Sequence, residues 1–150
     1  MSETETNPPS APAVDKLDSR VLAVAGVVVL GAIMSILDIT VVTIAMEKFR
    51  EVFEATPAQV AWTMTGYTLA LASVIPLTGW AADRFGTKRL YLLAVLLFTA
   101  GSVLCSLANS IETLVLFRVI QGLGGGMLMP LGMTILTRAA GPERVGRVMA

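Results

Sequence analysis

Four long apolar runs dominate the sequence and leave little choice of fold. They occupy residues 21–46, 58–80, 90–108 and 114–136. A run of about 20 such residues can cross the hydrocarbon core of a bilayer as a helix. Because lipid cannot satisfy backbone polar groups, a spanning segment forms all its hydrogen bonds within itself. The sequence therefore predicts an all-α transmembrane bundle with four complete spans.

The two ends of the chain lie outside these runs. Residues 1–20 are rich in Ser, Thr, Pro and Glu and lack hydrophobic periodicity, so we expect a disordered tail. At the other end, a polar stretch with Gly141 and Pro142 leads to residues 145–150, which resemble the first turn of a fifth helix. We therefore expect a partial N-terminal bundle over residues 21–150 that stops inside an element.

Composition excludes several functions. Of the residues, 55 % are hydrophobic and 15 % charged, and the formal net charge is zero, so no basic surplus attracts nucleic acid. There is no histidine, and Cys105 is the single cysteine. We therefore expect no metal site, no cofactor and no disulfide within the chain. No nucleophile–base pair is visible, so we do not expect an enzyme.

The Lys and Arg residues are distributed unevenly across the predicted membrane. One side holds Lys16, Arg20, Arg84, Lys88, Arg89, Arg138, Arg144 and Arg147. The other side holds Lys48 and Arg50, within a stretch, residues 47–54, that we expect to be a short external loop. By the positive-inside rule, the N-terminus is cytoplasmic. The predicted location is the inner (plasma) membrane, crossed several times.

Asp38 and Arg118 are the only ionisable side chains inside the predicted spans. Each costs on the order of 3 kcal/mol at a helix centre, so each needs a partner or water. Asp38 lies about 12 Å and Arg118 about 7 Å from the outer ends of their helices. At similar depths they can form a static ion pair, or they can face one aqueous cavity and couple proton movement to transport. Direct contact with a substrate, or snorkelling of either side chain to the interface, are the remaining interpretations.

Two further sets of residues are candidates for the interior of the bundle. Polar side chains that can line the same cavity are Thr40, Thr43, Tyr67 and Gln121. Gly122 and Gly126 have the small-xxx-small spacing that lets two membrane helices approach closely. A phosphate-binding loop is excluded at these glycines, because no strand precedes them and no Lys-Ser/Thr pair follows.

Three motifs carry a resemblance to a known family. Residues 79–89 are predicted to form a tight polar loop and resemble Gly-x-Leu-Ala-Asp-Arg-x-Gly-x-Lys/Arg-Arg, a signature of the major facilitator superfamily. The matching residues are Gly79, Asp83, Arg84, Gly86, Lys88 and Arg89, with Ala81 in place of Leu. Residues 118–126 resemble the Arg-x-x-Gln-Gly-x-Gly motif of the same superfamily. Residues 37–45 are similar to a motif of its fourteen-span drug:proton antiporter branch, with Thr43 in place of Asn.

The resemblance implies a secondary active transporter that exports drugs in exchange for protons by alternating access. Its partners would be protons, a small apolar or cationic drug-like substrate, the lipid bilayer and the remaining helices of the transporter. The loop at residues 79–89 would act as a cytoplasmic latch, and Arg118 would take part in proton coupling. Four spans cannot enclose a transport pathway in this family, so the chain is expected to be an incomplete N-terminal portion.

Two other functions fit four spans. One is a tetraspan structural or partner subunit that assembles through the face at Gly122 and Gly126. The other is a small four-helix drug transporter that acts as a dimer. The dimeric transporter gives no reason for the motif at residues 79–89 or for Arg118.

Overall fold

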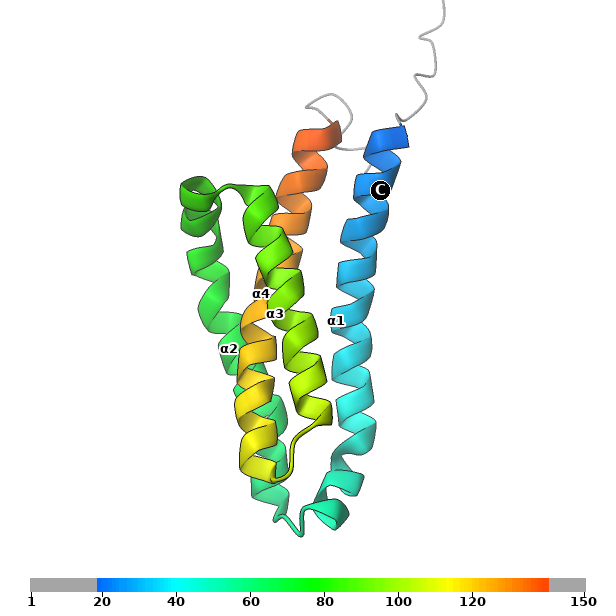
Figure 1. Ribbon diagram of the computed structural model, residues 1–150, viewed down its shortest axis with the longest axis vertical. Coiled ribbons are helices and arrows are strands. Elements are labelled where there is room, and N and C mark those ends of the chain that lie inside the picture. The colour runs from blue at the N-terminus through cyan, green and yellow to red at the C-terminus, as the bar shows by residue number, and fades with distance from the viewer. Residues whose placement is uncertain (1–18, 141–150) are drawn as a thin grey trace, which may run out of the picture.

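The computed structural model describes residues 19–140, which form four antiparallel α-helices (Figure 1). These are α1 (Ser19–Val52), α2 (Pro57–Phe85), α3 (Thr87–Ser106) and α4 (Ile111–Ala140). All four are long and apolar enough to cross a membrane, and the described range contains no strand. The all-α transmembrane fold is therefore confirmed. The first 18 residues of the expected tail and the expected fifth helix near residue 145 lie outside the described residues.

The first helix is longer than the sequence analysis expected. Residues 47–52 continue α1 instead of forming a loop. Glu47 pairs with Arg50 and Lys48 with Glu51, each at 2.9 Å, and such pairs three residues apart stabilise an exposed helix end. Phe49 on the other side of this helix end packs against the buried residues at the starts of α2 and α4. The apolar run ended at residue 46, but the amphipathic pattern did not.

The loop predicted at residues 79–89 is only one residue long in the structure. Residues up to Phe85 belong to α2 and residues from Thr87 belong to α3, so only Gly86 connects them. Gly86 has φ +88° and ψ 132°, a conformation that residues with a side chain rarely adopt. Its N–H donates to the Ala82 carbonyl at 2.9 Å, and its carbonyl accepts from the Leu90 N–H at 3.1 Å. One glycine thus closes α2 and opens α3.

The remaining helix ends differ from prediction by a few residues and have clear local causes. Thr56 and Gln59 form a reciprocal capping box, and Pro57 stands at the first helical position of α2. The Ser110 hydroxyl accepts from the Thr113 N–H at 3.3 Å at the start of α4. These caps extend α2 and α4 beyond the apolar runs that predicted them.

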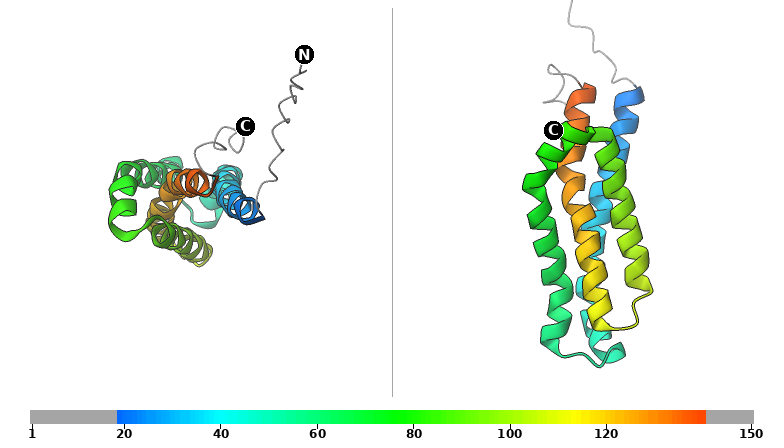
Figure 2. Two further views of the ribbon diagram at one scale, coloured as in Figure 1. Left: turned by 90° about the horizontal axis from the view of Figure 1, so that it is seen from above. Right: turned by 60° about the vertical axis from the view of Figure 1, so that its left-hand side comes forward.

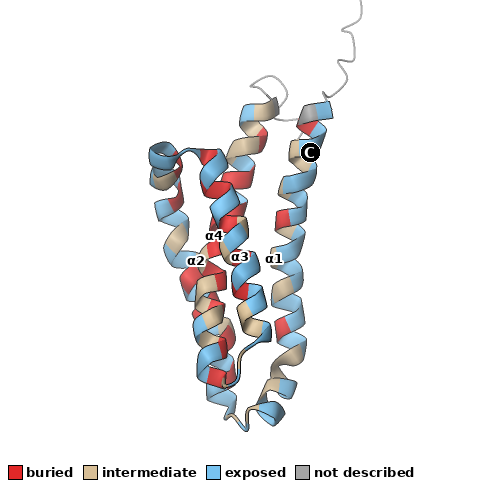
Figure 3. Cartoon of the chain, in the orientation of Figure 1, coloured by how far each residue is buried: buried red, intermediate tan, exposed pale blue. Residues whose placement is uncertain are grey.

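Helix α4 is the centre of the bundle. Viewed from above, α4 lies between α1, α2 and α3 (Figure 2). In an 18-residue apolar stretch of α4, 56 % of the residues are buried, whereas in the corresponding stretch of α1 the share is 11 %. Figure 3 shows the same contrast, with buried positions gathered where α2, α3 and α4 meet and most of α1 exposed.

Glycines on α4 allow this close packing. A Cβ added to Gly122 would lie 2.5 Å from the Tyr67 carbonyl oxygen, and one on Gly126 would lie 2.6 Å from the Leu71 carbonyl oxygen, both on α2. A Cβ on Gly124 would lie 2.5 Å from the Phe98 nitrogen on α3. Such approaches exclude any side chain, so the glycines set the distance from α4 to both neighbours.

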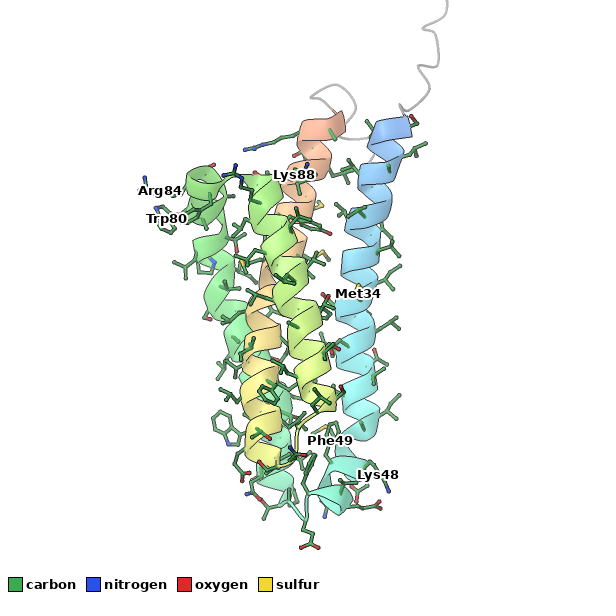
Figure 4. The ribbon with its side chains drawn as sticks, viewed as in Figure 1. Met34, Lys48, Phe49, Trp80, Arg84 and Lys88 are labelled. Carbon is green, nitrogen blue, oxygen red and sulfur yellow. The ribbon has the colours of Figure 1, made fainter. Side chains whose placement is uncertain are left out.

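The two ends of the bundle carry different charges. The start of α1, the Gly86 connection and the end of α4 lie at one end, and the other two connections lie at the opposite end (Figure 1). Arg84 and Lys88 are at the first end and Lys48 is at the second (Figure 4). These three basic residues therefore lie at the ends that the charge count predicts for them. Which end faces the cytoplasm stays a prediction.

We expect Gly86→Ala to lower the free energy of unfolding by about 1–3 kcal/mol, because alanine is strained at this backbone conformation. Thermal unfolding of the chain in detergent, followed by circular dichroism, measures the effect. Gly79→Ala is the matched control: Gly79 is helical, and a Cβ there meets nothing within 4 Å. Alanine should be neutral or slightly stabilising at that position. Equal effects of the two substitutions would contradict the strain at Gly86.

Candidate functional site

Asp38, Arg118 and Gln121 form a closed hydrogen-bonded network between α1 and α4. The Arg118 Nη1 donates to Asp38 Oδ2 at 2.6 Å and to Gln121 Oε1 at 2.9 Å. The Gln121 Nε2 donates to Asp38 Oδ1 at 2.8 Å. Arg118 and Gln121 are three residues apart, so they share one face of α4. Both carboxylate oxygens of Asp38 are therefore held by groups from the central helix.

Arg118 is also held from α2. Its guanidinium lies 4.1 Å from the centre of the Tyr67 ring, close enough for a cation–π interaction. Its Nε donates to the Thr63 carbonyl oxygen at 3.4 Å. The Arg118 side chain is 2 % exposed, whereas that of Asp38 is 14 % exposed. The arginine is thus a fixed interior cation, and the carboxylate is the more accessible partner.

A cavity of about 240 Å³ adjoins this network between α1, α3 and α4. Asp38, Arg118, Gln121 and Cys105 are among the polar residues that line it. Phe49 and Phe53 line it near the end of α1, and Ser106 and Leu114 line it near the connection between α3 and α4. The cavity therefore lies directly beside the carboxylate of Asp38.

Two buried polar atoms next to the network have no hydrogen-bond partner among the described residues. They are the Tyr67 hydroxyl oxygen and the Arg118 Nη2. Buried polar atoms without a partner are uncommon in folded proteins. Arg118 therefore keeps one donor for a partner other than Asp38.

The structure brings Tyr67 and Gln121 to the network but not the two threonines. Thr40 and Thr43 lie about 200° and 140° around α1 from Asp38, and both are exposed. Their hydroxyls donate to the Ile36 and Ile39 carbonyls at 3.0 and 2.8 Å. They face away from α4 and do not line the cavity beside Asp38.

The charged residues of the expected latch are all exposed. Asp83 and Arg84 lie in the last turn of α2, and Lys88 and Arg89 lie in the first turn of α3. None of the four forms an ion pair within residues 19–140. Their side chains are therefore available to segments outside this range.

Some contributors to these sites were missed by the sequence analysis. The Arg138 Nη1 donates to the buried Thr87 hydroxyl at 3.0 Å, which ties the end of α4 to the start of α3 beside the latch. The Thr63 carbonyl and the Cys105 thiol join the Arg118 network. Backbone carbonyls carry no sequence signal. Arg138 had counted only toward membrane orientation. In the described residues no cluster of His, Cys, Asp and Glu could hold a metal ion.

A comparison with protein families shows to which family the chain belongs. The model of the Major Facilitator Superfamily matches residues 28–150. The chain belongs to this superfamily. The resemblance carried by the three sequence motifs is confirmed, and the Asp38–Arg118 network joins two of these motifs.

Several curated proteins are similar to this member of the superfamily. A Mycobacterium tuberculosis protein named "Multidrug resistance protein B homolog" is 58 % identical over 136 residues, which are 91 % of this chain and 25 % of that protein. The Haemophilus influenzae "Multidrug export protein EmrB" is 39 % identical over 121 residues, or 81 % and 24 % of the two chains. The Pectobacterium atrosepticum "Putative multidrug resistance protein MdtD" is 38 % identical over 106 residues, or 71 % and 23 %. The chain spans about a quarter of the length of these relatives.

We expect Asp38→Ala and Arg118→Met each to destabilise the bundle by about 3–5 kcal/mol, because each leaves an unpaired charge in the interior. The double variant should lose much less than the sum, since it removes both charges. Equilibrium unfolding of the four proteins in detergent measures this double-mutant cycle. Additive losses would show that the two side chains do not interact.

Proposed function

We propose that this chain forms the first four spans of a proton-coupled multidrug exporter, a secondary active transporter that works by alternating access. The buried ion pair between Asp38 and Arg118 carries the proposal. An interior pair is costly to desolvate and rarely adds stability. A carboxylate that binds and releases protons during transport would explain why such a costly pair is present in the interior.

Asp38 is the proton acceptor in this proposal and Arg118 is its fixed partner. An arginine stays protonated in proteins, whereas a carboxylate beside a cavity can gain and lose a proton. Protonation neutralises Asp38 and weakens the bond that ties α1 to α4. Arg118 keeps its contacts with Tyr67, Thr63 and Gln121, so α4 holds its position while α1 is released. The freed Arg118 donors can then take an acidic group from another helix.

The exposed charges at the other end of the helices would serve as the latch. Arg84, Lys88 and Arg89 would grip acidic groups in the outward-open state, and Asp83 would meet the end of a neighbouring helix. Their partners would be the remaining helices of the transporter. Alternating access in such transporters moves one bundle against another, so a contact that forms in one state alone stabilises that state.

Other parts of the proposal rest on the relatives and on charge. Two relatives are named for multidrug resistance and one for multidrug export, which supports a small apolar or cationic drug as substrate. Thr40 and Thr43, on the exposed face of α1, would line the drug pathway. The basic end of the bundle supports a cytoplasmic N-terminus in the plasma membrane.

The structure disfavours assembly of a tetraspan subunit through Gly122 and Gly126. Both glycines are already packed against α2, so their face is not free for a partner. A dimeric four-helix transporter would belong to a different family, whereas this chain matches the Major Facilitator Superfamily.

We expect Asp38→Asn and Arg118→Ala to abolish drug-induced proton release by a full-length exporter that contains this chain, with both proteins still present in the membrane. The physical reason is that each variant removes one member of the Asp38–Arg118 ion pair. Proton release from proteoliposomes, followed with a pH-sensitive dye, measures it. The exposed carboxylate of Glu51 is the matched control, and Glu51→Gln should release protons normally. Normal release by both network variants would remove the coupling role.

The predicted orientation has its own test. In a Cys105→Ala background, we expect a cysteine placed at Lys48 to react with a membrane-impermeant maleimide in intact cells. A cysteine placed at Arg84 should react only after the cells are permeabilised, because these residues lie at opposite ends of the bundle (Figure 4). The reverse pattern would place the N-terminus outside.

A further inference from the structure

We propose that a cavity at the basic end of the bundle, between α1, α3 and α4, binds the headgroup and upper acyl chain of an anionic phospholipid. The cavity measures about 760 Å³, which is within the range of pockets that hold small-molecule ligands. Lys88 and Arg138 line it together with apolar side chains. Asp38, Arg118 and Gln121 do not line it, so the site is separate from their network and does not depend on the proposed transport role.

The apolar wall of the cavity suits an acyl chain. On α1 the lining runs from Val21 to Val28, which is about 10 Å along the helix at 1.5 Å per residue. Leu92 lines the cavity from α3, and Ile135 lines it from α4. All these residues belong to the apolar runs of the membrane spans, so the wall lies at the depth of the lipid tails.

Tyr91 crosses from α3 to α1 at the inner end of this wall. Its hydroxyl donates to the Val27 carbonyl at 3.2 Å, and a Cβ added to Gly31 would lie 2.8 Å from the same hydroxyl oxygen. The missing side chain of the glycine therefore makes room for the tyrosine. Because the α1 lining ends at Val28, a chain that enters between α1 and α3 meets Tyr91 after about two helical turns.

The two cations stand at the level of the lipid headgroups. Lys88 precedes the apolar run at residues 90–108 by two positions, and Arg138 follows the run at residues 114–136 by two. Lys88 is at the end of the bundle where α1 begins (Figure 4). Basic pockets between membrane helices at this level bind anionic headgroups. The order along the cavity, with cations outside and apolar side chains inside, is that of a phospholipid.

Arg138 is held in a position to receive a phosphate group. Its Nη1 donates to the buried Thr87 hydroxyl at 3.0 Å, which fixes the guanidinium beside the first turn of α3. Its Nη2 and Nε donate to no residue between positions 19 and 140. A guanidinium presents its donors in a rigid fork that matches two phosphate oxygens. Lys88, from the same turn of α3 as Thr87, adds a second cation to the lining.

The charges around the cavity select an anion. Neither Lys88 nor Arg138 forms an ion pair within the described residues. Arg84 and Arg89 lie at the same end of the bundle, where Asp83 is the only acidic residue between positions 19 and 140. A cationic drug is therefore repelled from the cavity. A zwitterionic lipid brings its own cation close to the basic side chains, so it gains less from them than an anionic lipid does.

We expect the full-length exporter that contains this chain to bind phosphatidylglycerol more tightly than phosphatidylcholine. Native mass spectrometry of the purified protein, titrated with each lipid, gives the two dissociation constants. In the double variant Lys88→Gln/Arg138→Gln, phosphatidylglycerol should bind about 25-fold more weakly, because each basic side chain contributes about 1 kcal/mol of attraction, or a factor of about five. The affinity for phosphatidylcholine should change little.

Two further variants separate the cavity from general effects of charge. Arg84→Gln/Arg89→Gln is the matched control, because it removes the same charge from the same end of the bundle without touching the cavity lining. Its affinity for phosphatidylglycerol should stay close to that of the wild type. Ala139→Trp keeps both cations but fills the cavity with an indole ring, so it should weaken binding. This variant tests the cavity even if the loss of Lys88 and Arg138 disturbs folding.

The location is checked with phosphatidylglycerol that carries a photoreactive diazirine in its upper acyl chain. Peptide mapping should find crosslinks within residues 21–28 or 135–139. Equal losses of affinity in the two double variants would show a general surface attraction and overturn the site. Wild-type affinity in Ala139→Trp, or crosslinks confined to other surfaces because a further helix of the exporter fills the cavity, would overturn it as well. None of these measurements involves proton release, so the site and the proposed function fail separately.

Discussion

A guanidinium buried on the central helix is the constraint around which the bundle is arranged. Arg118 cannot reach water from its 2 % exposed position, so its charge must be satisfied by side chains and carbonyls of other helices. α1 supplies the carboxylate of Asp38, and α2 supplies the Tyr67 ring and the Thr63 carbonyl. Through Gln121, α3 also contributes. Each of the other three helices therefore contacts Arg118, directly or through Gln121, at the same depth of the bundle.

The helices around this charge also pack with their backbones very close, which apolar attraction alone does not achieve in lipid. In a bilayer the tails are as apolar as the side chains, so packing and polar contacts hold helices together. The glycines of α4 let α2 and α3 approach until backbone atoms nearly touch. Gly101 does the same for α3 against Gln121. The glycine-rich stretch of α4 thus allows the close helix packing that surrounds the polar network.

Helix α1 is the least buried of the four described helices, and its polar contact with α4 is made by Asp38. In an 18-residue apolar stretch of α1 only 11 % of the residues are buried, and Tyr91, which donates to the Val27 carbonyl at 3.2 Å, gives the helix one further hydrogen bond to α3. An element attached through a group that can change its charge is suited to move when that charge changes. In the proposed function, the firmly packed α2, α3 and α4 would form the frame against which α1 moves.

The sequence by itself determined the number of helices, their membrane character, the family and the two interior charges. These follow from run length, from Gly86 and its neighbours, and from Asp38 and Arg118 standing alone in apolar surroundings. Only the tertiary structure decided that residues 47–52 extend α1, that Thr40 and Thr43 face away from Asp38, and that Gln121 bridges the pair. Apolar run length locates spans but not their amphipathic ends, and the rotation of one helix against another depends on contacts between distant residues. Local sequence carries no record of those contacts.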